Sequence, residues 1–141
     1  CNDRRWPETW RVMGMQDVDI VMLGYNTPVY NSVAAESPHL RMFHNHMSMQ
    51  AGAYQNGTWA VGVAKAGMEG GVDMMAGSCI IAPAGEIVAL ATTSEDEVVV
   101  AECDLDRGRY IRDTVFNFAQ HRRIEAYGVI TERTEAIAPP E

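Results

Sequence analysis

The clearest structural pattern lies in residues 37–65, which read SPHLRMFHNHMSMQAGAYQNGTWAVGVAK. Apolar residues recur there at spacings of three and four, which predicts a helix over residues 38–55. Ser37 is a typical N-cap, and Asn56-Gly57 is a typical helix stop. Large and small residues then alternate over residues 59–65, which predicts a strand. A helix followed directly by a strand predicts an α/β protein, in which α and β elements are mixed in layers.

The predicted helix carries two apolar stripes, and each has the spacing of residues that share one helix face. The first stripe consists of Leu40, Phe43, Met47, Ala51 and Tyr54. The second stripe consists of Met42, His46, Met49 and Ala53. Two such stripes predict a helix that is buried on two sides.

The rest of the chain supplies further elements of both kinds. Pro7 and Gly14 suit the first position and the end of a short helix. Apolar or alternating runs predict four more strands, at residues 20–23, 78–83, 86–91 and 97–103. The turn Ala84-Gly85 predicts that the second and third of these strands form a hairpin.

Size and charge exclude several classes of protein. The chain has 141 residues, which suits a single domain. It has 19 Asp and Glu residues against 11 Lys and Arg residues, which gives a formal net charge of −8. This charge repels a phosphate backbone, so we expect no nucleic-acid partner. No apolar run approaches the roughly 20 residues of a membrane helix, so we expect no membrane association.

Cysteine and histidine usage argues against disulfides and metals. Three cysteines, Cys1, Cys79 and Cys103, are spread widely along the chain. An odd number without a CxxC pair is not typical of a disulfide framework or of a zinc site. His44 and His46 are two residues apart and so point to different faces of the predicted helix, and we expect no metal site. Reduced thiols favour a cytoplasmic location.

The strongest candidate for chemistry is Cys1, within residues 1–8, which read CNDRRWPE. A cysteine beside two arginines lies in a positive field, which favours the thiolate, the reactive form of the thiol. The alternative is a solvated polar turn with an inert thiol. The residues alone leave both interpretations open.

Residues 1–8 resemble the nucleophile segment of the nitrilase superfamily of carbon–nitrogen hydrolases, in which polar, acidic and arginine residues follow the cysteine. The doublet Arg4-Arg5 before Trp6-Pro7-Glu8 is most similar to the N-carbamoyl-D-amino acid amidohydrolases, or D-carbamoylases. Other segments resemble the subgroup or the family in the same order, namely Tyr25-Asn26-Thr27-Pro28, residues 46–56, residues 77–87, and residues 102–106 with Arg109. The resemblance covers nearly the whole chain.

The resemblance implies a four-layer α-β-β-α sandwich with a catalytic Glu-Lys-Cys constellation. In it the cysteine attacks, the glutamate is the general base and the lysine stabilises the oxyanion. Only Cys1 has a counterpart here, because the glutamate and lysine of the family precede the cysteine; Lys65 follows it. The resemblance therefore implies that residues 1–141 are the C-terminal half of one hydrolase domain, with about residues 110–141 as a C-terminal extension that acts as an oligomer arm.

The resemblance also assigns substrate-binding roles by position. The backbone N–H of Asn2 would help to bind the oxyanion. Arg4 and Arg5 would bind the substrate α-carboxylate, for which the planar guanidinium is suited. Asn26 and Thr27 would border the same pocket and add hydrogen bonds. The alternative for the two arginines is a surface pair bonded to nearby carboxylates.

The implied activity is hydrolysis of an N-carbamoyl-D-amino acid to the D-amino acid, carbon dioxide and ammonia, with Cys1 as nucleophile and no cofactor. One alternative is an N-terminal-nucleophile hydrolase, in which the α-amino group of Cys1 is the base. Another is a non-catalytic fragment or subunit that lacks the glutamate and the lysine. The expected partners are the small-molecule substrate and further copies of the chain, as a dimer or tetramer. The apolar residues after Tyr110 favour that self-association.

Overall fold

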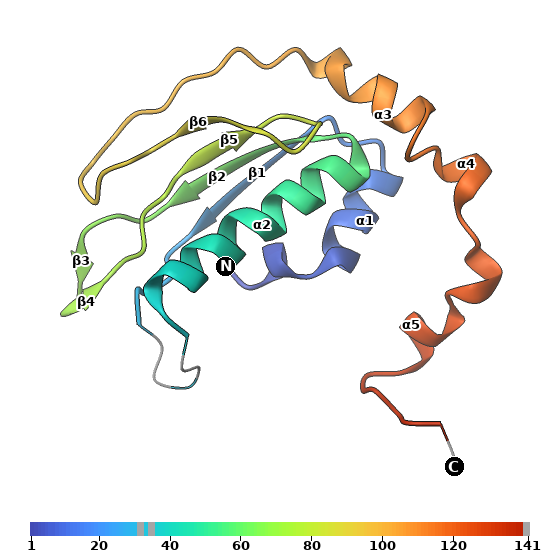
Figure 1. The fold of residues 1–141 in the computed structure, drawn as a ribbon, viewed down its shortest axis with the longest axis horizontal. Helices are drawn as coiled ribbons and strands as arrows, with labels where there is room; N and C mark the ends of the chain where they lie inside the picture. Colours follow the sequence, from blue (N-terminus) through green and yellow to red (C-terminus); the bar gives the residue numbers. More distant parts are fainter. Residues whose placement is uncertain (31–32, 34–35, 140–141) are drawn as a thin grey trace.

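The computed structural model describes residues 1–30, 33 and 36–139. Its centre is a four-stranded sheet with the strand order β1-β2-β5-β6 (Figure 1). These strands are β1 (Ile20–Tyr25), β2 (Trp59–Ala64), β5 (Cys79–Ile81) and β6 (Ile87–Leu90). β1 and β2 run parallel because a helix carries the chain back between them, whereas β2, β5 and β6 pair antiparallel. The α/β class and the hairpin predicted from the sequence are confirmed.

A 3₁₀ turn and one helix precede β1, and a second helix follows it. Both helices pack on one face of the sheet (Figure 1). These elements are η1 (Asp3–Arg5), α1 (Pro7–Met15) and α2 (Pro38–Asn56). α2 begins as predicted, because the Ser37 hydroxyl accepts a hydrogen bond from the Leu40 N–H. It ends at Asn56 and is capped by Gly57, whose φ of 58° lies in the left-handed region that favours glycine, so the predicted stop is confirmed.

α1 and α2 approach closely because each has a glycine at the contact. A Cβ atom on Gly52 would overlap the indole ring of Trp10, and one on Gly14 would overlap the side chain of Asn56. The sequence pattern places Gly14 at the end of a helix, but α1 continues to Met15. Gly14 therefore serves the contact between the helices and does not stop α1.

Only one of the two apolar stripes of α2 is buried within the described part of the chain. Met49 and Ala53 of the second stripe are fully buried against the sheet. The large residues of the first stripe are between 39% and 53% exposed; they are Leu40, Phe43, Met47 and Tyr54, here called the exposed α2 stripe. Burial on two sides is therefore not found in this chain, because the sheet covers one side of α2 and hydropathy does not tell which stripe faces it.

The hydrophobic core has one part on each face of the sheet. The larger part lies between the helices and the sheet, around Met49 and Ile81. The smaller part lies on the opposite face, around Trp59 and Ile80. Ile80 and Ile81 are neighbours in β5, and successive side chains of a strand point to opposite faces, so one short strand serves both parts.

Residues 97–103, predicted as a strand, cover the second face of the sheet without joining it. Val99 packs against the core beside Trp59, whereas Val98 and Val100 are 87% and 81% exposed. The alternation seen in the sequence is therefore real, but no strand among the described residues pairs with this segment. The strand prediction is wrong because alternation requires only one covered face, whereas a ladder requires a neighbouring strand edge.

A two-stranded hairpin projects from one end of the sheet, and a helical arm leaves the other end (Figure 1). The hairpin consists of β3 (Met68–Glu69) and β4 (Val72–Asp73). The arm contains η2 (Leu105–Gly108), α3 (Arg109–Asp113), α4 (Phe118–His121), η3 (Ile124–Ala126) and α5 (Gly128–Glu132). Residues 140–141 of the predicted extension lie outside the described residues. Among the helices of the described chain, none has the length and apolarity to cross a bilayer.

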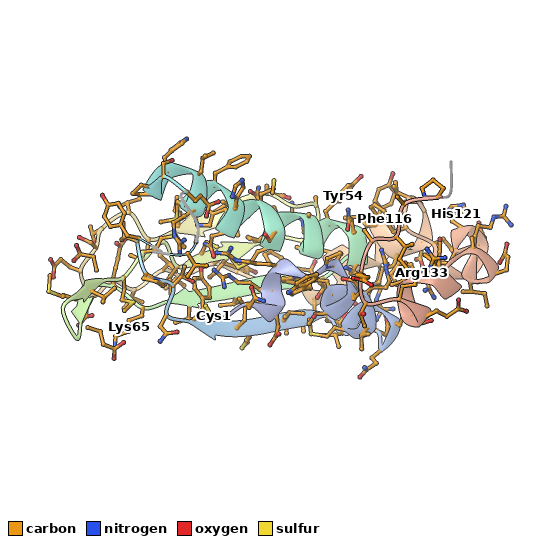
Figure 2. All side chains as sticks on the ribbon, turned by 90° about the horizontal axis from the view of Figure 1, so that it is seen from below. Cys1, Tyr54, Lys65, Phe116, His121 and Arg133 are labelled. Carbon is orange, nitrogen blue, oxygen red and sulfur yellow. The ribbon has the colours of Figure 1, made fainter. Side chains whose placement is uncertain are left out.

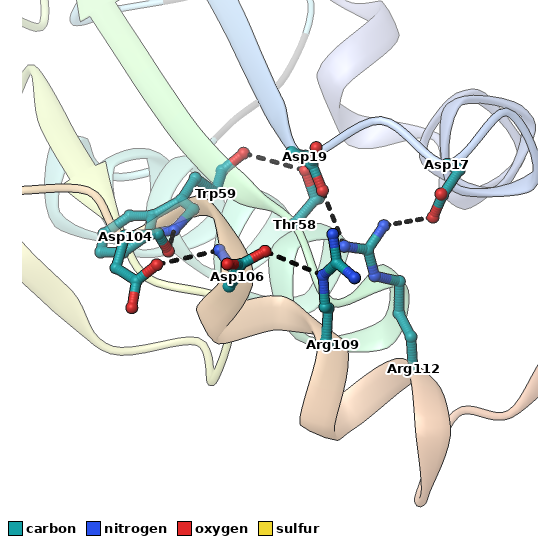
Figure 3. A network of polar contacts seen from close by, with 8 residues as sticks. All are labelled: Asp17, Asp19, Thr58, Trp59, Asp104, Asp106, Arg109 and Arg112. Carbon is teal, nitrogen blue, oxygen red and sulfur yellow. Dashed lines mark hydrogen bonds and ion pairs between the residues drawn. The ribbon is translucent and has the colours of Figure 1, made fainter.

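A polar network ties the start of the arm to the sheet (Figure 3). Arg112 forms ion pairs with Asp17 and with Asp19, the second at 2.7 Å. Trp59 donates its indole N–H to the Asp104 carbonyl at 2.8 Å and its backbone N–H to the Asp19 carbonyl at 2.9 Å. These contacts join the arm to β2 and to the loop before β1, and so they fix where the arm leaves the sheet.

Candidate active site

Cys1 has two close side-chain neighbours from other positions in the chain. Its Sγ atom lies 3.3 Å from Oγ1 of Thr27 and 3.5 Å from Nη1 of Arg4. The same Nη1 donates a hydrogen bond to the Cys1 carbonyl. Cys1 is nevertheless exposed, and Figure 2 shows it away from the helical arm. The thiol thus combines access to solvent with a cation and a hydroxyl in contact, which is the setting of a reactive cysteine.

The first turn of the chain directs Arg4 into the protein. The turn is closed by a hydrogen bond from the Arg5 N–H to the Asn2 carbonyl at 2.9 Å. Pro7 then starts α1, because proline fits the first helical position. Trp10 of α1 donates its indole N–H to the Arg4 carbonyl at 2.8 Å. With its backbone fixed in this way, Arg4 places its side chain between α2 and the end of β1.

The Arg4 guanidinium is buried among neutral groups, and the residue is only 4% exposed. Nε donates to Oδ1 of Asn45 at 2.9 Å, and Nη2 donates to Oγ1 of Thr27 at 3.0 Å. Its central carbon lies 4.0 Å from the centre of the Tyr25 ring. Burial is the main cause that lowers the pKa of Arg4, and the charge of Arg5 lowers it further. The hydrogen-bonding groups of Arg4 are therefore occupied by the protein itself.

Thr27 is fixed on both sides by backbone contacts. It lies two residues beyond β1 and is 4% exposed, and its carbonyl accepts a hydrogen bond from the Met75 N–H at 2.9 Å. The carbonyl of the next residue, Pro28, accepts from Nε of the buried Arg41 at 3.1 Å. The residue before a proline favours the extended conformation, which suits this exit from the strand. The Thr27 hydroxyl is thereby held beside Cys1.

The other predicted site residues make no side-chain contact with Cys1 among the described residues. Asn2 precedes η1 and makes no capping hydrogen bond with its side chain. Asn26 is exposed at the end of β1. Arg5 is half-buried, and within the described chain its guanidinium forms neither a hydrogen bond nor an ion pair. Arg5 is therefore open to a ligand, in contrast to its neighbour Arg4.

A cavity of about 190 Å³ borders Cys1. Its other walls come from η1, from α1 and from residues 21–24 of β1, and its charged side chains are Asp3 and Arg4. A second cavity, of about 560 Å³, lies between α1 and the arm and contains none of the predicted site residues. The smaller cavity is the candidate active site because it touches the candidate nucleophile. Arg4 lines it as well, whereas Arg5, Asn26 and Thr27 do not.

The remaining thiols and the single lysine lie in settings that do not suit this chemistry. Cys79 is fully buried in β5, and burial raises the pKa of its thiol to about 11, so the thiol is protonated at neutral pH. Cys103 packs against the smaller part of the hydrophobic core, around Trp59 and Ile80. Lys65 donates to Glu69 at 2.5 Å on the exposed surface. Among the described residues no group of three His, Cys, Asp or Glu side chains is placed to hold a metal ion.

Comparison with known proteins identifies the family. Residues 1–113 match the carbon–nitrogen hydrolase family. The chain belongs to this family. This carbon–nitrogen hydrolase is 28% identical over 129 residues to a nitrilase from Pyrococcus abyssi (strain GE5 / Orsay), and the match covers 90% of the chain and 44% of that protein. The chain thus spans less than half the length of this curated relative.

Solved structures share the fold of this carbon–nitrogen hydrolase. A carbon–nitrogen hydrolase from Helicobacter pylori G27 matches with a TM-score of 0.79 and 23% identity, over 94% of this chain and 47% of that one. A mutant amidase from Nesterenkonia sp. AN1 shows Michael addition of acrylamide at its active site cysteine. It matches with a TM-score of 0.58 and 20% identity, over 83% of this chain and 42% of that one. The nitrilase-type fold implied by the sequence resemblance is confirmed.

Two residues of the site were not assigned a role from the sequence, namely Asn45 and Tyr25, which hold Arg4. Asn45 is fully buried and lies one helical turn from Arg41 and Met49 on the buried side of α2. A polar residue on the buried side of an amphipathic helix needs a hydrogen-bond partner, and that pattern is the signal that marks it. The position of Arg4 beside it has no signature in the sequence.

Proposed function

We propose that this carbon–nitrogen hydrolase hydrolyses N-carbamoyl-D-amino acids, with Cys1 as the nucleophile. The observation that carries the proposal is the position of the Cys1 thiol, which is exposed at a cavity and within 3.5 Å of the Arg4 guanidinium. A neighbouring cation favours the thiolate, which is the nucleophilic form. The geometry thus suits a cysteine that attacks a carbonyl carbon from the wall of a small pocket.

Family membership supports the cysteine as nucleophile. The family match includes Cys1, and the related amidase has an active site cysteine that acrylamide modifies. This favours the nitrilase-type mechanism over one that uses the α-amino group of Cys1 as base. Because the chain covers 44% of its curated relative, we assign the glutamate base and the oxyanion lysine of the family to the rest of the protein.

We assign the binding of the substrate α-carboxylate to Arg5. A carboxylate that leaves water needs charged hydrogen-bond donors, or its desolvation is uncompensated. The guanidinium of Arg5 has no partner within the described chain, whereas that of Arg4 is already bonded to Asn45 and Thr27. Of the two arginines that the resemblance places at the carboxylate, Arg5 fits that role and Arg4 fits a role at the nucleophile. Asn26 is exposed beside Thr27 and adds hydrogen bonds to the substrate.

The proposed chemistry proceeds in two stages. The Cys1 thiolate attacks the carbamoyl carbon, and the backbone N–H of Asn2 donates to the oxygen on which negative charge develops. Collapse of this tetrahedral species breaks the bond to the terminal nitrogen, which leaves as ammonia, while the carbamoyl carbon stays on the Cys1 sulfur as a thiocarbamate. Water then attacks that carbon and releases the thiol, and the resulting N-carboxy amino acid loses carbon dioxide. The final products are the D-amino acid, carbon dioxide and ammonia.

A set of matched substrates tests the assignment in the full-length protein. Ammonia release is measured with an N-carbamoyl-D-amino acid, its L enantiomer, a simple aliphatic amide and a simple nitrile. We expect kcat/KM for the D-carbamoyl compound to exceed the values for the amide and the nitrile by about 100-fold or more, because a site built for a polar group rejects analogues that lack it. The L enantiomer should also react more slowly, because it cannot place its carboxylate, its side chain and its carbamoyl carbon in the same positions at once. Hydrolysis of the simple amide or nitrile at a comparable rate would contradict the substrate assignment.

We also propose that the protein is a homo-oligomer, either a dimer or a tetramer, and two surfaces support this. The exposed α2 stripe is uncharged, because Arg41, the charged residue of α2, is 3% exposed. The larger cavity between α1 and the arm is lined by apolar residues such as Phe118 and Ile130. In it, Nη1 of Arg11 is buried without a hydrogen-bond partner among the described residues. Depletion of charge and exposed apolar area are typical of subunit interfaces.

Substitution of Phe43 by glutamate tests self-association. Phe43 is 53% exposed in the middle of the exposed α2 stripe, so Phe43→Glu places a charge within the proposed interface. We expect the Kd for self-association, measured by light scattering over a dilution series, to rise by about tenfold or more. The matched control is Met68→Glu, at a 68% exposed residue of the β3–β4 hairpin at the other end of the sheet (Figure 1). A wild-type monomer at micromolar concentration, or equal behaviour of the two variants, argues against this interface.

A cytoplasmic location is proposed as well. The three cysteines are free, and free thiols are typical of a reducing compartment.

A further inference from the structure

A buried cation without a carboxylate partner lies behind the candidate nucleophile. Among the described residues, no Asp or Glu forms an ion pair with Arg4. Besides the Cys1 sulfur, the groups that accept its hydrogen bonds are the Asn45 amide oxygen, the Thr27 hydroxyl and the Cys1 carbonyl, which are all neutral. Burial of a charge without a counter-ion is costly. Such an arrangement is therefore a candidate for a functional role, and the thiol of Cys1 is the ionisable group in contact with it.

A chain of contacts from the sheet and from α2 holds this cation in place. Oδ1 of Asn45 accepts from Nε of Arg4 at 2.9 Å, and Nδ2 of Asn45 donates to the Tyr25 hydroxyl at 3.1 Å. The hydroxyl of Tyr25 thereby fixes which way the Asn45 amide points. The ring of Tyr25 also lies 4.0 Å from the guanidinium carbon, in a cation–π contact. Asn45 is 0% exposed and Tyr25 is 6% exposed, so water does not compete for these bonds.

We propose that Asn45 and Tyr25 are positioning residues, which hold the Arg4 guanidinium against Cys1 so that the cation stabilises and aims the thiolate. The inference rests on the proposed role of Cys1 as nucleophile and adds two residues outside the predicted site. Neither residue touches the thiol itself; both act through Arg4.

Within this chain few charged groups surround Cys1. The glutamate and lysine that we assign to the rest of the protein also face the thiol in the full-length protein, but they are the same in every variant compared, so a difference between variants reports on Arg4. Asp3 and Arg4 are the charged side chains that line the cavity beside Cys1, and Arg5 acts on Arg4 through its charge. Burial raises the pKa of the Tyr25 phenol, so Tyr25 stays neutral at physiological pH. The residues of α1 that line the cavity are Thr9, Trp10 and Met13, and none of them titrates. Of these charges, Arg4 is the one within 3.5 Å of the sulfur.

The pH dependence of Cys1 alkylation in the full-length protein tests the proposal. Asn45→Asp keeps the shape of the side chain but places a carboxylate against Nε of Arg4, which neutralises the cation. We expect the midpoint of the pH–rate profile with iodoacetamide, followed by mass spectrometry of the Cys1 peptide, to rise by about 1 pH unit or more. At neutral pH we expect kcat to fall by about tenfold or more, with KM changed by less than about threefold.

Tyr25→Phe is the second variant, because it removes only the hydroxyl that orients Asn45 and leaves the ring beneath Arg4. We expect its midpoint to rise in the same direction by a few tenths of a pH unit, roughly a third of the shift in Asn45→Asp. If Asn45→Asp does not fold, this conservative variant decides the question.

The matched control is Asn56→Asp. Asn56 is also buried on α2, at 2% exposed, but its amide donates to the Gly52 carbonyl and has no contact with Arg4. Asn56→Asp should leave the alkylation midpoint at the wild-type value, whatever its effect on stability. Equal shifts in Asn45→Asp and Asn56→Asp, or no shift in either Asn45→Asp or Tyr25→Phe, would overturn the proposal. Alkylation requires no substrate, so this result is independent of the substrate assignment. If Cys1 of the wild-type protein is not alkylated, the assignment of Cys1 as the nucleophile is contradicted instead.

Discussion

Cys1→Ala in the full-length protein is expected to abolish hydrolysis of N-carbamoyl-D-amino acids while leaving their binding nearly unchanged. The thiol forms the covalent bond to the carbamoyl carbon, so its removal should lower kcat by roughly 10⁴-fold or more. The thiol contributes little to ground-state affinity, so the substrate Kd should change by less than about threefold. The side chain of Cys1 is exposed, and its contacts are with Arg4 and Thr27, so the fold should tolerate alanine.

Two measurements and one control complete this experiment. Turnover is followed by ammonia release, and binding is followed by calorimetric titration of the inactive variant. Cys103→Ala is the matched control, because Cys103 is a half-buried thiol whose hydrogen bond is a weak one to the Ala101 carbonyl at 3.9 Å. It should keep near-normal turnover. Residual turnover in Cys1→Ala close to that of the control would show that another group attacks the substrate.

Arg5→Ala is expected to raise KM for N-carbamoyl-D-amino acids by roughly 30-fold or more. Removal of one partner of a desolvated charge pair costs about 2–5 kcal/mol, which corresponds to that loss in binding. The carboxylate takes no part in the bond changes at the carbamoyl carbon, so kcat should change much less than KM. Arg5→Lys should restore only part of the affinity, because an ammonium group does not reproduce the bidentate geometry of a guanidinium.

A substrate analogue distinguishes a loss of carboxylate recognition in Arg5→Ala from a general loss of activity. In this analogue the α-carboxylate is replaced by a neutral amide. The wild-type protein should strongly prefer the acid, whereas Arg5→Ala should treat acid and amide almost alike. Arg133→Ala is the control, because Arg133 is exposed on the arm, away from Cys1 (Figure 2). Equal discrimination by wild type and Arg5→Ala would mean that the carboxylate is read by Arg4 or by a residue outside this chain.

The sequence predicts those elements whose ends and turns are determined by residues close together in the chain. The N-cap Ser37 and the left-handed Gly57 bound α2 because both act through the local backbone. The hairpin of β5 and β6 was predicted because Gly85, at φ 91°, supplies a conformation that other residues avoid. Such signals need no knowledge of the tertiary structure.

The features that sequence could not predict depend on what lies across a surface. The exposed α2 stripe is as apolar as the buried stripe, and only the position of the sheet decides between them. Val99 alternates with its exposed neighbours as a strand residue would, yet no neighbouring strand lies within the described chain. In both cases the apolar pattern is local, and it does not record what lies across the face that carries it.

The different surroundings of Arg4 and Arg5 also have no signal in the sequence. The two arginines are adjacent, but Arg4 is buried whereas Arg5 is half-buried. Which of them enters the protein depends on Trp10, which fixes the backbone of Arg4, and on Asn45, which receives its guanidinium from 41 positions away. The motif therefore points to a nucleophile segment, but it does not show which arginine contacts the thiol.

The most direct measurement of the central claim is to map the covalent intermediate. The full-length protein is mixed with an N-carbamoyl-D-amino acid, quenched in acid within a single turnover and digested, and the peptides are weighed by mass spectrometry. Attack by Cys1 predicts a substrate-derived acyl group on the peptide that contains Cys1, none on Cys79 or Cys103, and none anywhere in Cys1→Ala. An acyl group on a different residue, or rapid turnover in Cys1→Ala, would contradict the assignment of Cys1 as the nucleophile.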